Sequence, residues 1–296
     1  MKYVITGSLG NISKPIVESL VKVGHAVTVV TSSQDKVAAI QSIGALPAVG
    51  SVEDSAFVNK TFAGAAAVYL MIPPNWALTG GWLAYQRKVA DIYTQAVIAS
   101  GIKHVVLLSS VGAHMGKGSG PVDGLSYAEW KLNQLKSVNL KILRPSYFFN
   151  NLMGQISMIR NMGIMGSNYG GTSEKLVLAH TQDIADVAIT ELLGLKFKGH
   201  TIQYIASDER HPSEIAAVIG KAIGKPGLAW VEFKDADAFE GMLKGGLSKT
   251  LAEGYTDLGR ALRLGTAQED YWKNKPKLGK GKLEDFAKAF AQAYNS

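Results

Sequence analysis

The sequence predicts an α/β protein in which helices cover both faces of a parallel sheet. Over roughly the first two hundred residues, short apolar runs without polar alternation, typical of buried parallel strands, alternate with helical patterns. Such a succession implies a doubly wound sheet with right-handed crossovers. After residue 150 the pattern is less regular, which predicts a smaller C-terminal α/β lobe beside the sheet.

The individual elements follow from the same patterns. Strands are predicted at residues 2–6, 26–30, 66–72, 105–108 and 140–143, and later at 175–179, 200–205 and 228–233. Helices are predicted at residues 11–23, 35–43, 55–62, 82–100 and 127–136, and later at 183–193, 213–223 and 283–294.

The first strand runs into a glycine-containing turn and then a helix. Gly7 can adopt the left-handed backbone of a sharp turn, and Gly10 lets the backbone approach a ligand closely. The N–H groups of the following helix point at the same spot, which suits a pyrophosphate. We therefore predict a dinucleotide site formed by Thr6, Gly7, Leu9, Gly10, Asn11 and Ile12. Ser13 stands where a third glycine is usual, and a plain strand-to-helix turn is the alternative interpretation.

This site sets the expected domain organisation. Residues 1–150 are expected to form a dinucleotide-binding Rossmann domain whose core is completed by residues 175–206. Residues 151–296 are expected to form mainly a substrate-binding lobe over the carboxyl ends of the strands.

Composition excludes several classes of protein. No segment approaches the roughly 18 to 20 apolar residues of a membrane span, and the first strand leaves no room for a signal peptide. We therefore expect a cytoplasmic protein that does not bind a membrane. The chain has no cysteine, so redox chemistry requires an organic cofactor. The six histidines lack the spacing of a metal site, so no metal is expected.

The net charge is +7, and five lysines fall within residues 273–282. A basic run can contact nucleic acid phosphates. Pro276, Gly279 and Gly281 interrupt this run and favour an exposed loop before the last helix, so nucleic acid binding is not expected. Whether the chain forms a homodimer or stays a monomer is left open.

A second group of residues suggests proton chemistry. Ser109 and Ser110 end an apolar strand, and Tyr127 and Lys131 have the i, i+4 spacing that places side chains on one helix face. Lys131 and an oxidised nicotinamide would both lower the pKa of the Tyr127 phenol towards neutral pH, so that Tyr127 could deliver a proton. Ser110, or alternatively Ser109, would orient a substrate carbonyl.

This pairing has a competing interpretation. About one Tyr-x-x-x-Lys/Arg match is expected by chance in this composition, and a second match occurs at Tyr271 and Lys275. Ser126 and Glu129 have capping-box spacing, which predicts that Tyr127 begins its helix at the rim of the sheet. The alternative is a surface pair on an exposed helix.

The end of the second strand indicates the cofactor. Thr31, Ser32 and Ser33 stand where an NAD site usually has a carboxylate, and Lys36 follows. Hydroxyls and a lysine suit a 2′-phosphate, so NADP(H) is predicted over NAD(H). Asp35 is expected to cap the next helix.

Further contacts are predicted at the other strand ends. Ile72, Pro73 and Pro74 form a rigid turn beside the expected cofactor groove, where Ser109 and Lys131 are also expected to contact the cofactor. Aromatic side chains near the strand ends could line an apolar substrate pocket, although they could equally be core: Trp76, Trp82, Tyr147, Phe148 and Phe149.

Motifs spread along the chain resemble the NmrA-like group of atypical short-chain dehydrogenases. They are Val4-Ile-Thr-Gly-Ser-Leu-Gly10, Val68-Tyr-Leu-Met-Ile-Pro-Pro74, the segment 96–110 ending in Leu-Leu-Ser-Ser, Ile142-Leu-Arg-Pro145, Asp183-Ile-Ala-Asp-Val-Ala188 and Lys282-Leu-Glu-Asp-Phe-Ala287. That group includes NAD(P)H-dependent reductases, quinone-type oxidoreductases and catalytically silent nucleotide sensors. Many members of that group lack the Tyr-x-x-x-Lys pair. Because this chain keeps Tyr127 and Lys131, the resemblance favours an enzyme over a sensor.

Two hypotheses result. The first is an NAD(P)H-dependent oxidoreductase that reduces a small carbonyl or quinone-like molecule. The second is a non-catalytic NADP(H) sensor that regulates through a protein partner.

Overall fold

The computed structural model describes residues 1–75, 78, 81–171 and 174–296. Within these residues the central sheet has seven strands, all parallel, in the order β10-β6-β5-β4-β1-β2-β3. They are β1 (Lys2–Ile5), β2 (Ala26–Thr31), β3 (Leu46–Val49), β4 (Ala67–Leu70), β5 (His104–Leu108), β6 (Asn139–Pro145) and β10 (His200–Ile205). The predicted doubly wound fold is confirmed. Because the strand order reverses between β1 and β4, the ligand crevice is expected outside their carboxyl ends.

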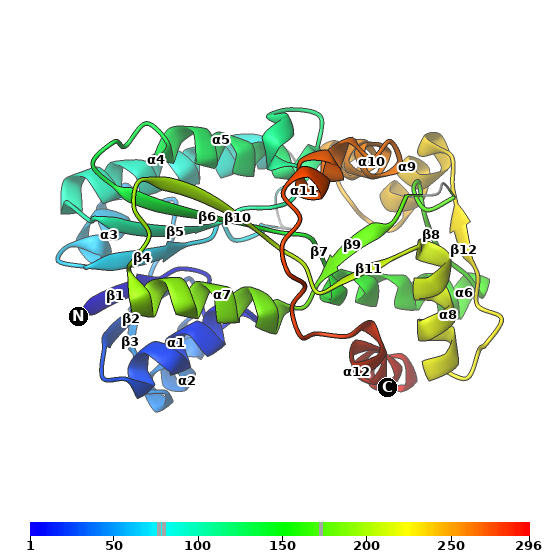
Figure 1. The fold of residues 1–296 in the computed structure, drawn as a ribbon, viewed down its shortest axis with the longest axis horizontal. Coiled ribbons are helices and arrows are strands. Elements are labelled where there is room, and N and C mark those ends of the chain that lie inside the picture. The colour runs from blue at the N-terminus through cyan, green and yellow to red at the C-terminus, as the bar shows by residue number, and fades with distance from the viewer. Residues whose placement is uncertain (76–77, 79–80, 172–173) are drawn as a thin grey trace.

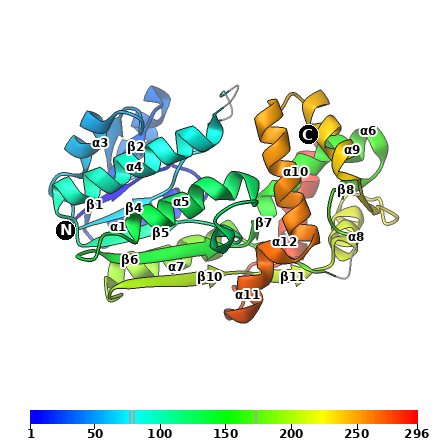
Figure 2. The same cartoon turned by 90° about the horizontal axis from the view of Figure 1, so that it is seen from above.

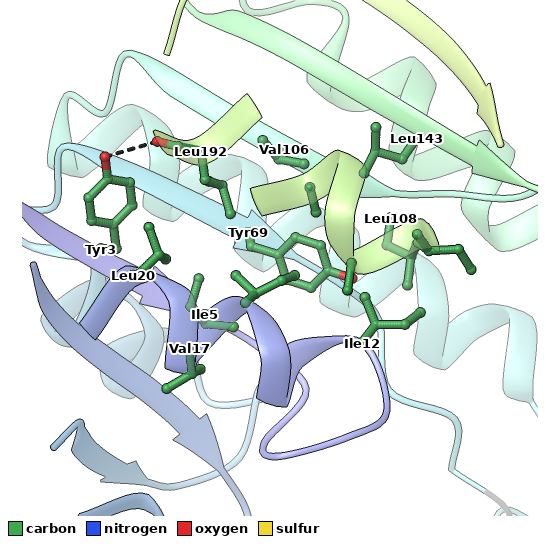
Figure 3. Packing of buried hydrophobic residues seen from close by; sticks show 14 of the residues in the cluster. Tyr3, Ile5, Ile12, Val17, Leu20, Tyr69, Val106, Leu108, Leu143 and Leu192 are labelled. Atoms are coloured by element: carbon green, nitrogen blue, oxygen red, sulfur yellow. Dashed lines mark hydrogen bonds between the residues drawn. The ribbon is translucent and has the colours of Figure 1, made fainter. Parts of the chain in front are cut away.

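Two layers of helices enclose this sheet (Figure 1). One face carries α1 (Ser13–Lys22), α2 (Val37–Ser42) and α7 (Thr181–Gly194); the other carries α3 (Ser55–Phe62), α4 (Trp82–Ser100) and α5 (Asp123–Leu132). Successive residues of a strand face opposite sides, so Ile5 is buried against the first layer and Val4 against the second. Figure 3 shows the first of these cores, where the Tyr69 ring lies between Ile5 and Ile12.

The C-terminal lobe lies beyond the carboxyl ends of the central strands (Figure 2). It contains a three-stranded sheet of β7 (Tyr147–Phe148), β9 (Leu176–Ala179) and β11 (Asp208–Arg210), and a pair of β8 (Met165–Ser167) and β12 (Trp230–Glu232). Its helices are α6 (Ile156–Met162), α8 (Pro212–Ala222), α9 (Asp235–Lys244), α10 (Lys249–Arg263), α11 (Glu269–Lys273) and α12 (Leu283–Asn295). Thus β9 belongs to the lobe, whereas α7 and β10 return to the central sheet.

Two local predictions were wrong. Helix α5 begins at Asp123, not at Tyr127, so Ser126 lies inside the helix and donates to the Val122 carbonyl at 3.2 Å. There is accordingly no capping box there, and the Glu129 side chain is free to turn inward. Asp35 was expected to cap the helix after β2, yet within the described chain no side chain caps that helix or the short 3₁₀ turn before it.

The lysine-rich segment is an exposed loop between α11 and α12, as predicted. Lys273 pairs with Glu269 and Lys275 with Glu209, so two of its charges are compensated by neighbouring carboxylates. In the part of the chain that the structure describes, no helix is long and apolar enough to cross a bilayer. Those residues also contain no cluster of three or more His, Cys, Asp or Glu that could hold a metal ion.

Candidate functional site

The turn after β1 depends on a glycine. Gly7 has φ +90°, in the left-handed region, and a Cβ built there would lie 2.7 Å from Met71 Cγ. Ser8 also has a positive φ of 55°. Its hydroxyl donates to Thr31 Oγ1 at 3.1 Å, which fixes the turn against the end of β2. The backbone therefore crosses from β1 to α1 in one tightly determined path.

The helix that follows presents an open N-terminus. Among the described residues no side chain caps α1, and its first turn carries no acidic residue. A Cβ on the exposed Gly10 would meet only the Gly7 carbonyl oxygen, at 3.3 Å, so the space over Gly10 is open. Ser13, in place of the third glycine, donates inward to the Thr6 carbonyl at 3.1 Å. An uncapped helix N-terminus beside open backbone fits a phosphate group.

Three residues of the predicted site have side chains that shape this turn. Thr6 is fully buried, and its Oγ1 accepts from the Met71 N–H at 2.7 Å, which joins β1 to the end of β4. Thr31 is buried between Ser8 and the Ser33 N–H. Leu9 packs against the first core. The positions open to a ligand are therefore Gly10 and Asn11, both exposed, together with the backbone of Ile12, whose side chain is buried.

The end of β2 presents polar groups to solvent. Ser32 is exposed, Ser33 is half-buried, and Lys36 is exposed with no ion-pair partner among the described residues. Asp35 is also exposed. This edge thus offers two hydroxyls, one ammonium and one carboxylate close to the turn that ends in α1.

The end of β4 is fixed by two tyrosines that the sequence analysis missed. Tyr93 donates to the Met71 carbonyl at 3.1 Å, and Tyr85 donates to the Pro73 carbonyl at 2.9 Å. Burial and the nearby Glu53 raise the pKa of Tyr85 to about 12, so this phenol remains a donor at neutral pH. The only sequence signal was their position on the predicted helix 82–100. Of the predicted turn, Ile72 is buried, Pro73 is half-buried and Pro74 is exposed.

The two serines after β5 differ in their surroundings. Ser109 is 3% exposed and donates to Glu129 Oε1 on α5 at 2.5 Å. Ser110 is half-buried, and its hydroxyl has no hydrogen-bond partner within the described chain. Ser110 is therefore the serine available to a ligand at the carboxyl edge of the sheet.

Tyr127 and Lys131 do not lie beside Ser109. Tyr127 donates to Asp91 Oδ1 on α4 at 3.0 Å, and Lys131 Nζ lies 2.9 Å from the same oxygen. Residues of an α-helix are about 100° apart, so Tyr127 points about 200° away from Glu129, the residue that does meet Ser109. The pair occupies the seam between α4 and α5.

The predicted pKa of Tyr127 was wrong in direction. Burial and then the hydrogen bond to Asp91 raise this pKa, and they outweigh the lowering effect of Lys131. The second Tyr-x-x-x-Lys pair is arranged in the same way. Tyr271 and Lys275 bind the two carboxylate oxygens of Glu209, at 2.6 and 2.8 Å. In this chain the spacing places both side chains on one carboxylate. Tyr271 is also fully buried.

The predicted substrate aromatics fall into separate places. Phe149 is fully buried in the core of the lobe, 5.6 Å from the Phe286 ring. Trp82 donates to the Thr250 carbonyl at 3.2 Å and so joins α4 to α10. Tyr147 and Phe148 are half-buried in β7, where the chain leaves the central sheet. Trp76 lies outside the described residues.

Comparison with known proteins identifies the family. The family model described as NAD(P)H-binding matches residues 7–158, just over half of the chain, beginning at the turn glycine. The chain belongs to this family. Together with the seven-stranded sheet, the match fits the NmrA-like group of atypical short-chain dehydrogenases. No curated protein sequence matches the chain significantly.

Solved structures share the fold over nearly the whole chain. A triphenylmethane reductase from Citrobacter sp. superposes with a TM-score of 0.78 at 16% identity, covering 99% of this chain and 100% of that one. An NADPH-dependent quinone oxidoreductase from Escherichia coli gives 0.77 at 19% identity, covering 99% and 100%. A nucleoside-diphosphate-sugar epimerase from Staphylococcus aureus gives 0.77 at 14% identity, covering 97% and 100%. At identities of 14–19%, these superpositions establish a shared fold.

Lys36→Ala tests the edge beside β2. If Lys36 contacts a 2′-phosphate, the variant should bind NADPH more weakly by about 1.5–3 kcal/mol, the range for a hydrogen bond to a charged group. NADH binding should remain nearly unchanged. Calorimetric titration of both cofactors measures the difference. Lys22→Ala, which removes an exposed lysine at the far end of α1, is the matched control. Equal losses for both cofactors would show that Lys36 does not select between them.

Proposed function

We propose that this protein is an NAD(P)H-dependent oxidoreductase that prefers NADP(H) and reduces a small quinone-like substrate. The observation that carries the proposal is the uncapped N-terminus of α1 beside the open Gly10, in a chain of the NAD(P)H-binding family. Gly10, Asn11 and the backbone of Ile12 would hold the pyrophosphate after the turn at Gly7, and Ser32, Ser33 and Lys36 would hold the ribose phosphate. When bound, the nicotinamide supplies a hydride.

The far end of the cofactor would lie near the ends of β4 and β5. The backbone of Ile72, Pro73 and Pro74 is held there by Tyr85 and by the Tyr93 contact to Met71. The open hydroxyl of Ser110 lies at the end of the neighbouring strand, since β4 and β5 pair directly. We assign to Ser110 the role of donating a hydrogen bond to a substrate carbonyl oxygen.

Helix α5 supports a quinone-like acceptor over a simple ketone. The residue one turn before Glu129, on the same face and nearer the carboxyl edge, is Leu125. It packs against the second core, so this position offers no proton. Hydride addition to a ketone gives a strongly basic alkoxide that needs a positioned acid. Hydride addition to a quinone gives a phenolate whose conjugate acid has a pKa of about 10, which water can protonate.

The structural neighbours support a quinone-like acceptor. Two of them are described as a triphenylmethane reductase and an NADPH-dependent quinone oxidoreductase. Structures of both proteins with NADP(H) or NADPH superpose with TM-scores of 0.77 and 0.75. They make NADPH the first cofactor to test and conjugated aromatic acceptors the first substrates.

The test compares acceptors of matched size. NADPH oxidation is followed with a set of benzoquinones and naphthoquinones and with aryl ketones of similar shape. The proposal expects turnover on quinones at least about 100-fold faster than on ketones, which is the lower end of what a positioned general acid contributes. Efficient ketone reduction would contradict the proposal that the apolar Leu125 occupies the position of the proton donor.

A non-catalytic sensor remains the second candidate, because Leu125 at this position also fits a site without chemistry. A sensor would bind NADP⁺ and NADPH with different affinities and oxidise NADPH with no acceptor of either set. Calorimetry with both redox forms, run beside the turnover assay, separates the two functions.

Tyr127→Phe and Lys131→Ala test the position of the Tyr-Lys pair. Because both side chains bind Asp91 at the seam between α4 and α5, we expect each variant to keep quinone turnover within about twofold of wild type. Ser110→Ala is the contrasting variant. Losing its donated hydrogen bond should lower turnover by about tenfold, which corresponds to about 1.4 kcal/mol. A fall of 10²–10⁴-fold in Tyr127→Phe would instead make this tyrosine the general acid.

A further inference from the structure

A buried ionic network connects the end of β5 to the C-terminal lobe. Glu129 and Arg144 are each 5% exposed. Arg144 Nε lies 3.0 Å from Glu129 Oε1, and Arg144 Nη2 lies 2.6 Å from Oε2. Arg144 Nη1 also donates to Asp270 Oδ2 on α11 at 3.1 Å. Tyr204 on β10 donates to the same Asp270 oxygen.

This network fixes the hydrogen-bond polarity of Ser109. A carboxylate paired with an arginine only accepts hydrogen bonds, so the Ser109 hydroxyl must donate its hydrogen bond to Glu129. The Ser109 oxygen then keeps only lone pairs for any other partner. The Ser109 N–H donates to the Leu143 carbonyl at 2.8 Å, and the Val111 N–H donates to the Pro145 carbonyl at 2.9 Å. Ser110 therefore lies between two residues whose backbones are bonded to β6.

We infer that Glu129 is a positioning residue, which holds the Ser109–Ser110 strand end in the geometry that lets Ser110 meet the substrate. The inference rests on the function proposed above. Arg144 makes this possible, because a carboxylate that is buried alone would be expelled or neutralised. Asp270 extends the same network to α11, more than a hundred residues further along the chain.

Glu129→Gln tests this inference, because the amide keeps the shape of the side chain and removes its charge. The matched control is Glu191→Gln, which breaks the pair of Glu191 with Lys141, another ion pair made by β6. In wild type, Glu129→Gln and Glu191→Gln we would measure kcat with a quinone, KM for NADPH, and amide hydrogen exchange of residues 109–111.

We expect Glu129→Gln to lower kcat by at least about tenfold with KM for NADPH within twofold, and to speed exchange at residues 109–111. Glu191→Gln should change none of these. Ser109→Ala removes the group that Glu129 holds, so its kcat should fall similarly and the double variant should fall no further. If Glu129 were merely structural, Glu129→Gln would lower the melting temperature and leave kcat of the folded enzyme unchanged.

The outcomes separate this inference from the proposed function. If wild type oxidises NADPH but Glu129→Gln matches Glu191→Gln in kcat and exchange, the positioning role is wrong and the function stands. If wild type oxidises no NADPH, the function is wrong. The exchange of residues 109–111 then decides the inference, which fails if Glu129→Gln leaves it unchanged.

Discussion

Gly10→Val is expected to abolish dinucleotide binding while the protein stays folded. A Cβ on Gly10 would meet only the Gly7 carbonyl oxygen, at 3.3 Å, and no side chain of the core, so we expect the core to stay intact. The space over Gly10 is where a pyrophosphate must lie to reach the N–H groups of α1. Loss of two charge-assisted contacts, at about 1.5–3 kcal/mol each, weakens NADPH binding by roughly 100-fold or more.

Calorimetric titration of NADPH measures this loss, with circular dichroism to verify the fold. Gly227→Val is the matched control, because Gly227 lies in an exposed loop where a Cβ meets nothing within 4 Å. That variant should bind NADPH as wild type does. Normal binding by Gly10→Val would mean that the turn is structural and that the cofactor lies elsewhere.

Arg144→Met is expected to give the largest loss of stability. Among the described residues, Arg144 is the only cation in contact with Glu129. Without it, the Glu129 carboxylate, which is 5% exposed, has no positive charge beside it. Breaking a buried ion pair from one side costs about 3–5 kcal/mol, because the remaining charge stays desolvated. Denaturant unfolding should show that loss in the free energy of unfolding, and thermal unfolding a melting temperature lower by roughly 10 °C.

The double variant Arg144→Met with Glu129→Leu separates the charge from the packing. Because it removes both charges and keeps apolar volume, it should recover most of the lost stability. Lys141→Met breaks a less buried pair of the same strand and should cost about 1 kcal/mol. A double variant as unstable as Arg144→Met would show that shape at this position matters more than charge.

The sequence predicted the features that depend on neighbouring residues. The turn at Gly7 and the open start of α1 are decided by a positive φ and by the absence of a capping side chain, both local properties. Most of the central strands were predicted because they are buried on both faces and therefore continuously apolar. The short edge strand β3 was missed, since Pro47 interrupts its pattern and its side chains are largely exposed.

Features that depend on distant residues could not be predicted. The spacing of Tyr127 and Lys131 places them on one helix face, but Asp91 on α4 decides which way that face points. Glu129 had the spacing of a capping box, and only the position of Arg144 on β6 draws its carboxylate inward. Strand β9 was recognised as a strand, yet its pairing with β7 and β11 required the path of the whole lobe.

The most direct test of the proposed function is anaerobic single-turnover oxidation of NADPH by a quinone, compared between wild type, Gly10→Val and Tyr127→Phe. We expect one equivalent of NADPH to be oxidised by wild type and by Tyr127→Phe at similar rates. Gly10→Val should show no oxidation above the rate without protein. If wild type binds NADPH without oxidising it, or if Tyr127→Phe alone stops the reaction, the proposed function or the proposed site is wrong.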